Sequence, residues 1–489
     1  MADKKDILTY FPHHLKPRDV QKNCLLEISR VWDKAEIIVV NLPVASGKSA
    51  ISMTVARWAK TASIITPSKL LVNQYKDEYT NVHVLRGKSD YWCATFDCVL
   101  TKRPKGKKIP TLCPPTLYCD GCNTYRSDLR KARVMPYLLS NYYTYMAHKL
   151  YRPVLIADEA HQLISVLKSM ARKSLWWNKY KFPTKIKTRA EIKSWAESLT
   201  EYQKQNDFSI RGLLEELNSK FPRYLVGRDT DRFRGEDDER IYLEPVDIRD
   251  EPPFMWPSSV GKILLLSATI SRKDIEQMGL GGKRIAYIEA DSPINAENRP
   301  VIIPRESVSL SFNQQEVNLP KIAEYIKNCA AHHSEDKGLI HITYGLAEKL
   351  RTILGADSRF IWHDKENKMA QYKKFRESEE PVILVASGMY EGIDLPYDSG
   401  RWQVVAKVPW PSLAEPAIKY LLSQDKEYYA WETIKTTLQA CGRICRTPED
   451  FGVTYIVDST FKRLYNDNPT LFPLWFKNSV SIEGGDDDD

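Results

Sequence analysis

The segment LPVASGKS at residues 42–49 restricts the fold of this chain more than any other feature. It follows the β-branched run IIVV and precedes an amphipathic pattern, so it connects a buried strand to a helix. Gly47, Lys48 and Ser49 fit the end of the phosphate-loop pattern, in which backbone N–H groups cradle phosphates, the lysine neutralises them and the hydroxyl binds Mg²⁺. Because Leu42 replaces the first glycine of that pattern, an incidental GKS at a helix start is the alternative.

A second segment, VLIADEAH at residues 154–161, argues against that alternative. Its strand would deliver two consecutive carboxylates. Asp158 is suited to hold Mg²⁺ through water, and Glu159 to orient and deprotonate the water that attacks a γ-phosphate. An acidic strand end beside a helix is common, but its pairing with GKS upstream predicts hydrolysis of a nucleoside triphosphate.

Short apolar runs typical of buried strands recur along the whole chain. They alternate with helical patterns, which predicts parallel sheets covered on both faces. At 489 residues the chain is too long for one hydrophobic core, so we expect two α/β domains. The expected strands are residues 37–40, 63–66, 154–157 and 262–266, and then 338–343, 382–386, 403–408 and 453–457.

The segment QACGRICR at residues 439–446 belongs to the second domain. In a helix, Gln439, Arg443 and Arg446 would lie at i, i+4 and i+7 and therefore on one face. Two arginines projected across a domain cleft would stabilise negative charge on a γ-phosphate, as arginine fingers do. A solvated basic helix face is the alternative.

Five of the nine cysteines fall within residues 93–122, in a stretch with basic residues and prolines and little periodicity. This clustering favours a metal site over a disulfide framework. Four thiolates can bind Zn²⁺ or a 4Fe–4S cluster equally well, and spacing alone does not choose between them. The clustered cysteines are Cys93, Cys98, Cys113, Cys119 and Cys122.

The chain resembles superfamily 2 helicases through a set of short elements in the order of that family's motifs. The set covers nearly the whole chain, which makes the resemblance specific. Besides the two segments above, it comprises KPRDVQ at 16–21, TPSKLLVNQ at 66–74, SAT at 267–269, GLIHITYG at 338–345, SGMYEGIDLP at 387–396 and QACGRICR at 439–446.

The resemblance implies roles for individual residues. Asp158 and Glu159 would perform hydrolysis, and His161 with Ser267–Thr269 would couple hydrolysis to DNA movement. Ala45 stands where this family usually has glycine, which narrows the backbone conformations open to the phosphate loop. The nucleotide and Mg²⁺ would contact Arg18, Gln21, Ala45, Ser46, Gly47, Lys48, Ser49, Gly392 and Asp394, with Glu391 helping to sense nucleotide and DNA.

The same resemblance favours iron for the cysteine cluster. The cysteines lie between TPSKLLVNQ and the DEAH segment, where helicases of the XPD/DinG type carry an iron–sulfur domain. RGKSDYWC at 86–93 and CNTYRSDLRKA from residue 122 resemble its flanks. The resemblance makes Cys93 and Cys122 the outer ligands. We take Cys113 and Cys119 as the inner pair, with Cys98 spare, and Cys98 in place of Cys113 stays open.

The expected fold is α/β, with two RecA-like parallel-sheet domains and two insertions in the first. An iron–sulfur insertion would occupy 88–124, and a mostly helical insertion at 165–256 matches the position of the family's arch domain. Within it, residues 173–189 mix basic and aromatic residues, as single-strand-binding or half-buried amphipathic segments do. The remaining boundaries are 1–87, 125–164 and 257–275 for the first domain, 276–482 for the second and 483–489 for an acidic tail.

Charge and hydropathy limit the class of partner. The net charge of +8, from 71 basic and 63 acidic residues, suits a polyanion without identifying one. No apolar run reaches the ~18–20 residues of a membrane span, and MADKKDILTY lacks a signal-peptide core, so we expect a cytoplasmic protein. We also expect it to be a monomer.

The resemblance implies an ATP-dependent DNA helicase that moves 5′→3′ on single strands. Its cofactors would be ATP, Mg²⁺ and a 4Fe–4S cluster. Its partners would be single-stranded and forked DNA, together with a single-strand-binding, replication or repair protein. A DNA-stimulated ATPase that does not unwind, and a nucleotide-gated DNA-binding module without turnover, are the alternative functions.

Overall fold

The computed structural model describes residues 6–43, 45–87, 90–93, 98–99, 120–183, 186, 188–233, 236–249, 256–390 and 393–483. Four residues singled out above lie outside these ranges, namely Cys113, Cys119, Glu391 and Gly392. Among the described helices, none combines the length and the apolar character that crossing a bilayer requires.

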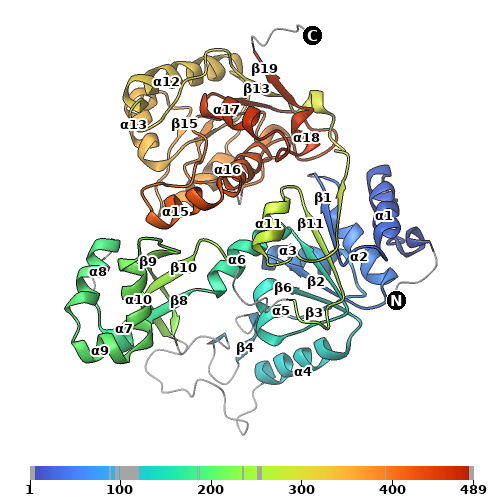
Figure 1. Cartoon of the computed structure of the whole chain (residues 1–489). Helices are drawn as coiled ribbons and strands as arrows, with labels where there is room; N and C mark the ends of the chain where they lie inside the picture. The colour runs from blue at the N-terminus through green and yellow to red at the C-terminus, as the bar shows by residue number, and fades with distance from the viewer. Residues whose placement is uncertain are drawn as a thin grey trace.

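The first domain is a parallel sheet with helices on both faces (Figure 1). Its strands are β1 (Ile37–Asn41), β2 (Ala62–Thr66), β3 (His83–Val84), β6 (Tyr137–Asn141), β7 (Val154–Asp158), β11 (Lys262–Ser267) and β12 (Ile285–Glu289), in the order β12-β1-β11-β7-β2-β6-β3. One face packs against α1 (Asp19–Val31), α2 (Lys48–Trp58) and α3 (Lys69–Glu78). The other packs against α4 (Asp120–Val134), α5 (Tyr142–His148), α6 (Leu163–Met170) and α11 (Arg272–Gln277).

The second domain repeats this architecture. Its strands are β13 (Val301–Ile303), β14 (Gly338–His341), β15 (Phe360–Ile361), β16 (Ile383–Val385), β17 (Trp402–Val405), β18 (Val453–Ile456) and β19 (Val480–Ile482), all parallel, in the order β15-β16-β14-β17-β18-β13-β19. α12 (Gln315–His332) and α13 (Tyr344–Leu354) cover one face. The other carries α14 (Lys368–Glu377), α15 (Pro416–Gln424), α16 (Lys426–Cys441), α17 (Thr460–Asp467) and α18 (Leu474–Lys477).

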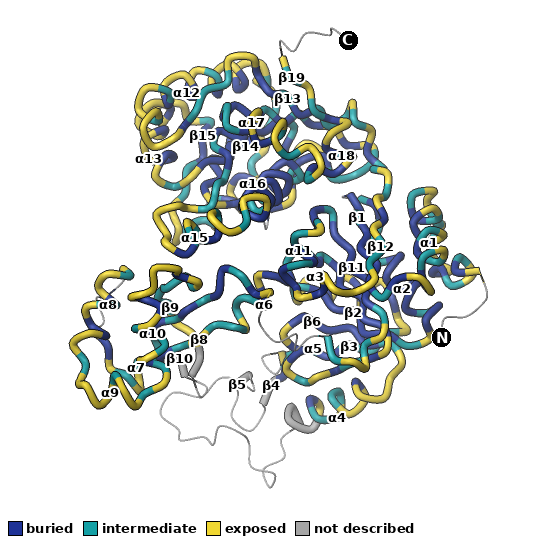
Figure 2. Tube along the Cα trace, viewed as in Figure 1, coloured by how far each residue is buried: buried dark blue, intermediate teal, exposed yellow. Residues whose placement is uncertain are grey.

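The two parallel sheets confirm the predicted fold class. Every strand expected from an apolar run is present. In all of them except β18 the central residues are buried because helices exclude water from both sides (Figure 2), whereas Tyr455 in β18 is half-buried. The chain therefore has two similar α/β domains, each with its own core on both sides of its sheet.

The predicted domain boundary at residues 275 and 276 is wrong. β12 pairs in parallel with β1, with Ile37 opposite Ile285, so the first sheet extends to Glu289. The second sheet begins at β13 with Val301. β12 lies at the edge of the sheet and is mostly exposed or half-buried, and its short run IAYI was not among the expected strands.

The insertion between α6 and β11 contains the expected helices and also a sheet that its sequence does not predict. Its helices are α7 (Trp177–Tyr180), α8 (Arg189–Ser198), α9 (Glu201–Asn206) and α10 (Phe208–Asn218), and its antiparallel strands are β8 (Lys173–Trp176), β9 (Tyr224–Phe233) and β10 (Glu236–Pro245). β9 and β10 are highly charged, and opposite charges pair across them. Arg240 lies directly opposite Asp229, with Nε 2.7 Å from Oδ1.

Within the described part of the aromatic and basic stretch 173–189, Leu175, Phe182 and Ile186 belong to the core of this insertion, and Trp177 and Tyr180 pack against it. Phe182 is buried, and the Trp177 indole N–H donates to its carbonyl oxygen at 3.0 Å. The structure therefore favours the half-buried amphipathic interpretation of this stretch. The insertion also contacts the second domain, because the ring centroid of Phe221 lies 5.6 Å from that of Tyr420 on α15.

A buried polar contact joins the two domains through α16. Asp274 on α11 is fully buried, and its Oδ1 lies 3.2 Å from Lys435 Nζ on α16. The Trp431 indole N–H donates to its other oxygen at 2.8 Å. The backbone N–H of Ser271 donates to the same oxygen at 2.9 Å. Burial without these partners would be costly for a carboxylate, so the contact fixes α16 against α11.

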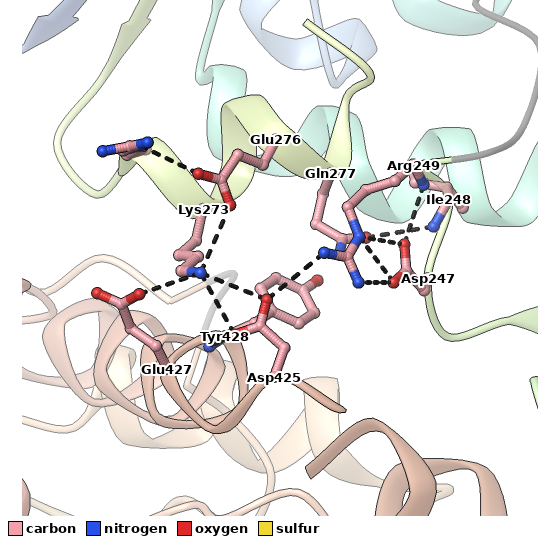
Figure 3. A network of polar contacts seen from close by, with 10 residues as sticks. Asp247, Ile248, Arg249, Lys273, Glu276, Gln277, Asp425, Glu427 and Tyr428 are labelled. Carbon is pink, nitrogen blue, oxygen red and sulfur yellow. Dashed lines mark hydrogen bonds and ion pairs between the residues drawn. The ribbon is translucent and has the colours of Figure 1, made fainter. Parts of the chain in front are cut away.

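A second, more exposed network lies beside this contact (Figure 3). Lys273 Nζ lies 3.3 Å from Asp425 Oδ1 and 3.0 Å from Glu427 Oε2, around the N-terminus of α16. Arg249 lies on the segment that returns from the insertion, and its Nη1 is 3.7 Å from Asp425 Oδ2. The first domain, its insertion and the second domain therefore meet at one carboxylate.

Replacing Lys435 with methionine should destabilise the protein, because the Asp274 carboxylate would stay buried without its cation. We expect a loss of about 3–5 kcal/mol, measured as a shift of the denaturant unfolding curve. Lys373→Met on α14 is the matched control, since that side chain is 75% exposed and its pair with Glu377 is worth about 0–1 kcal/mol. Equal effects of the two substitutions would contradict this account of the interface.

Candidate functional site

The carboxyl ends of β1, β7 and β11 open into a cavity of about 610 Å³ between the two domains. The carboxyl edge of a parallel sheet is where α/β proteins bind ligands. The predicted site residues that line this cavity are Ala45, Ser46, Gly47, Lys48, Ser49, Asp158, Glu159, Gln439, Arg443 and Arg446.

The phosphate loop has a strained, left-handed backbone. Ala45 has a φ of 66° and Gly47 a φ of 74°, and Gly47 immediately precedes α2. A side chain in this region costs about 1–2 kcal/mol, so Ala45 is unfavourable where glycine would not be. Arg18 and Gln21 support the loop from α1 and its N-terminal flank. Arg18 donates to the Ala45 carbonyl at 2.6 Å and Gln21 to the Gly47 carbonyl at 3.4 Å.

The two carboxylates at the end of β7 have opposite environments. Asp158 is buried and accepts a hydrogen bond from the Tyr75 hydroxyl at 2.9 Å, whereas Glu159 Oε1 lies 2.8 Å from Lys48 Nζ. Burial and the negative charge of Glu159 raise the pKa of Asp158 to about 6. Burial alone would raise the pKa of Glu159 as well, but the Lys48 ammonium, its hydrogen bond to the carboxylate and the other basic groups nearby together outweigh burial, and that pKa falls to about 2. Glu159 is therefore ionised.

The DEAH and SAT segments contact each other directly. The His161 ring nitrogen Nδ1 lies 2.8 Å from the Ser267 hydroxyl, which accepts from the Thr269 backbone N–H at 3.0 Å. His161 Nδ1 also lies 3.5 Å from Glu159 Oε2. Burial lowers the pKa of His161 to about 4, so the ring is neutral at pH 7.

The predicted helix over residues 439–446 is wrong beyond Cys441. α16 ends at Cys441, so Gln439 is helical while Arg443 and Arg446 follow the helix. Both arginines still line the cavity. Arg443 donates to the Ile393 carbonyl at 2.9 Å, and Arg446 forms an ion pair with Asp394. Irregular backbone, and not helical spacing, brings them to the site.

Residues that the sequence analysis did not assign to the site complete the cavity, two of them, Leu71 and Gln74, within the TPSKLLVNQ segment. Leu71, Gln74, Tyr75 and Glu78 line it from α3, at the spacing of one helical face. That spacing was a usable signal in the sequence. Trp475 on α18 also lines the cavity, and its indole N–H donates to the Ala268 carbonyl at 3.4 Å. Trp475 is far from the SAT segment along the chain, so no local sequence pattern indicated this contact.

Two of the five clustered cysteines, Cys113 and Cys119, lie outside the described residues. Strands β4 (Trp92–Cys93) and β5 (Cys98–Val99) pair in antiparallel fashion, with Cys93 opposite Cys98 in the register. Cys122 lies in α4. Within the described ranges, no group of three or more histidine, cysteine or acidic residues could hold a metal ion. The iron–sulfur cluster therefore stays a prediction.

Comparison with known proteins gives one family and several distant relatives. Residues 332–479 match the family described as Helicase C-terminal domain. The chain is 22% identical over 245 residues to the 3′-5′ exonuclease DinG of Bacillus subtilis, covering 45% of this chain and 26% of the relative. It is also 22% identical over 247 residues to a probable ATP-dependent helicase of Methanocaldococcus jannaschii, covering 45% and 38%. The matches span well under half the length of either relative.

Solved structures resemble nearly the whole chain. An XPD helicase matches with a TM-score of 0.64 at 14% identity, covering 96% of this chain and 99% of the other. Xpd4 of S. tokodaii matches with a TM-score of 0.57 at 12% identity, covering 95% and 100%. At such identities the likeness shows the fold alone.

Gly47→Ala should weaken binding of a fluorescent ATP analogue about tenfold, because it would force a side chain into the left-handed region at a cost of about 1–2 kcal/mol. The new Cβ would also lie 2.3 Å from Gln21 Nε2 and 2.8 Å from a terminal Arg18 nitrogen, displacing both supports of the loop. Gly212→Ala in α10 is the control, since its Cβ would meet nothing within 4 Å. Unchanged affinity in Gly47→Ala would contradict the proposed loop geometry.

Proposed function

Because this chain is related to superfamily 2 helicases of the XPD/DinG type, we propose that it is an ATP-dependent helicase that translocates on single-stranded DNA and unwinds duplex. The observation that carries this proposal is the cavity between the domains. It is lined by the phosphate loop and acidic pair of the first domain and by Gln439, Arg443 and Arg446 of the second. A nucleotide there would contact both domains, so its binding and hydrolysis would change how they sit together.

The proposed chemistry follows from the groups at the end of β1 and β7. The Ser49 hydroxyl and the Asp158 carboxylate both line the cavity, and such oxygens are the donors that Mg²⁺ prefers. Bound Mg²⁺ would neutralise charge on the phosphates. Lys48 pairs with Glu159 in this structure, so phosphates that attract Lys48 would release the Glu159 carboxylate to act as general base.

The proposed role of the second domain is to stabilise the transition state. Arg443 and Arg446 line the cavity opposite the phosphate loop, where two cations would offset charge that develops on the γ-phosphate. Arg446 would first exchange its ion pair with Asp394 for the phosphate. Gln439 would orient the nucleotide or water, and His161 with Ser267–Thr269 would transmit the state of the γ-phosphate.

The proposed nucleotide contacts divide into two groups. Ala45, Ser46 and Gly47 would bind phosphate through the backbone of the loop, and Arg18 and Gln21 would hold that loop in place. Gly392 and Asp394 would sense the nucleotide from the second domain, by resemblance to the family.

Single-stranded DNA as the track and 5′→3′ movement are proposed from the resemblance, and the positive net charge agrees with a polyanionic partner. A strand-displacement assay on duplex DNA with either a 5′ or a 3′ single-stranded overhang tests both points. ATP hydrolysis without unwinding would favour a DNA-stimulated remodelling ATPase. DNA binding without hydrolysis would favour a nucleotide-gated binding module.

We also propose a structural 4Fe–4S cluster on Cys93, Cys113, Cys119 and Cys122. Its support is the position of these cysteines between the TPSKLLVNQ and DEAH segments. Cys98 in place of Cys113 stays the alternative ligand.

Glu159→Gln should keep ATP affinity and reduce hydrolysis at least ~100-fold, because the amide keeps the shape of the side chain and cannot accept a proton. Hydrolysis is measured with and without single-stranded DNA, and nucleotide binding separately. Glu377→Gln on α14 is the control, since that carboxylate is 66% exposed and does not line the cavity. Near-normal turnover in Glu159→Gln would remove Glu159 from the proposed mechanism.

Serine at Cys93, Cys113, Cys119 or Cys122 should abolish bound iron and the broad absorption near ~400 nm of anaerobically purified protein, because each removes one of the four thiolates a 4Fe–4S cluster needs. Cys98→Ser should keep both and serves as the control. Loss of iron in Cys98→Ser with retention in Cys113→Ser would exchange these two residues in the ligand set.

A further inference from the structure

Three side chains at the end of α3 surround the two proposed Mg²⁺ ligands. The Tyr75 hydroxyl donates to Asp158 Oδ2 at 2.9 Å. The Tyr79 hydroxyl donates to the Ser49 hydroxyl oxygen at 3.3 Å, and Ser49 in turn donates to Glu78 Oε2 at 3.3 Å. None of these three residues lies in a motif that the sequence analysis singled out.

The helix geometry and the core hold these groups in place. Tyr75 and Glu78 are spaced i and i+3 on one face of α3, and Tyr79 directly follows the helix with an extended backbone. The two tyrosines are only 2% and 1% exposed, and their ring centroids lie 5.9 Å apart within the first-domain core. Packed rings of this kind leave their hydroxyls little freedom to move.

The contacts orient both ligands and leave lone pairs for a metal ion. Asp158 Oδ1 accepts from the Glu159 backbone N–H at 2.9 Å while Oδ2 accepts from Tyr75, so the carboxylate cannot rotate freely. A hydroxyl has one proton and two lone pairs. Ser49 directs its proton to Glu78 and one lone pair to Tyr79, which leaves the other for Mg²⁺.

We propose that Tyr75, Glu78 and Tyr79 are positioning residues that orient Ser49 and Asp158 for Mg²⁺. This inference rests on the proposed function, because it assumes that the cavity binds a Mg²⁺–nucleotide complex. It assigns α3 a second task beyond covering the sheet: two buried tyrosine hydroxyls and the exposed Glu78 carboxylate at its C-terminal end set the geometry of the metal site.

The test compares the affinity of a fluorescent ADP analogue in EDTA and in saturating Mg²⁺. Tyr75→Phe keeps the buried ring and removes only the hydrogen bond to Asp158. We expect unchanged affinity for the ADP analogue in EDTA. Mg²⁺ should then raise this affinity by a factor about tenfold smaller than in the unsubstituted protein, as expected for a lost hydrogen bond to a charged group. Tyr79→Phe and Glu78→Ala should reduce the same increase through Ser49.

Tyr145→Phe is the matched control. Tyr145 on α5 is fully buried in the same domain, and its hydroxyl has no hydrogen-bond partner among the described residues. It should leave both affinities unchanged. A Tyr75→Phe protein with the full Mg²⁺ effect, or with affinity lost equally in EDTA, would overturn the inference and leave the proposed function standing. An unsubstituted protein that binds no nucleotide would overturn both.

Discussion

The contact between Asp274 and Lys435 is the interaction on which the rest of the site depends. A carboxylate buried in the first domain is satisfied by an ammonium and an indole N–H of α16, so the cost of its burial is met only when the two domains touch. α16 then ends beside the phosphate loop, with Gln439 in its last turn. A cavity with walls from both domains follows from this placement.

The sequence predicts well what depends on local order. A central parallel strand is buried on both faces, so β1 and β7 carry continuous apolar runs that are visible without a structure. Gly47, Lys48 and Asp158 then follow from the strand ends. The prediction of a helix over residues 439–446 was wrong because periodicity does not show where a helix ends. Gly442, directly after Cys441, was a usable stop signal.

The remaining features depend on contacts between distant segments. β12 is an edge strand that is mostly exposed or half-buried, and β9 and β10 are stabilised by ion pairs across strands that no single segment reveals. The support of Asp158 by Tyr75 requires α3 to pack beside β7, and the approach of Trp475 to Ala268 requires both domains. Such contacts leave almost no trace in local sequence.

The position of Asp425 has a mechanical consequence. Its two oxygens face Lys273 of the first domain and Arg249 at the root of the insertion, while Phe221 of the insertion packs near Tyr420 on α15. The insertion therefore contacts both α/β domains. Widening of the cleft between them would break one of these contacts. Opening of the cleft and tilting of the insertion would therefore be coupled movements.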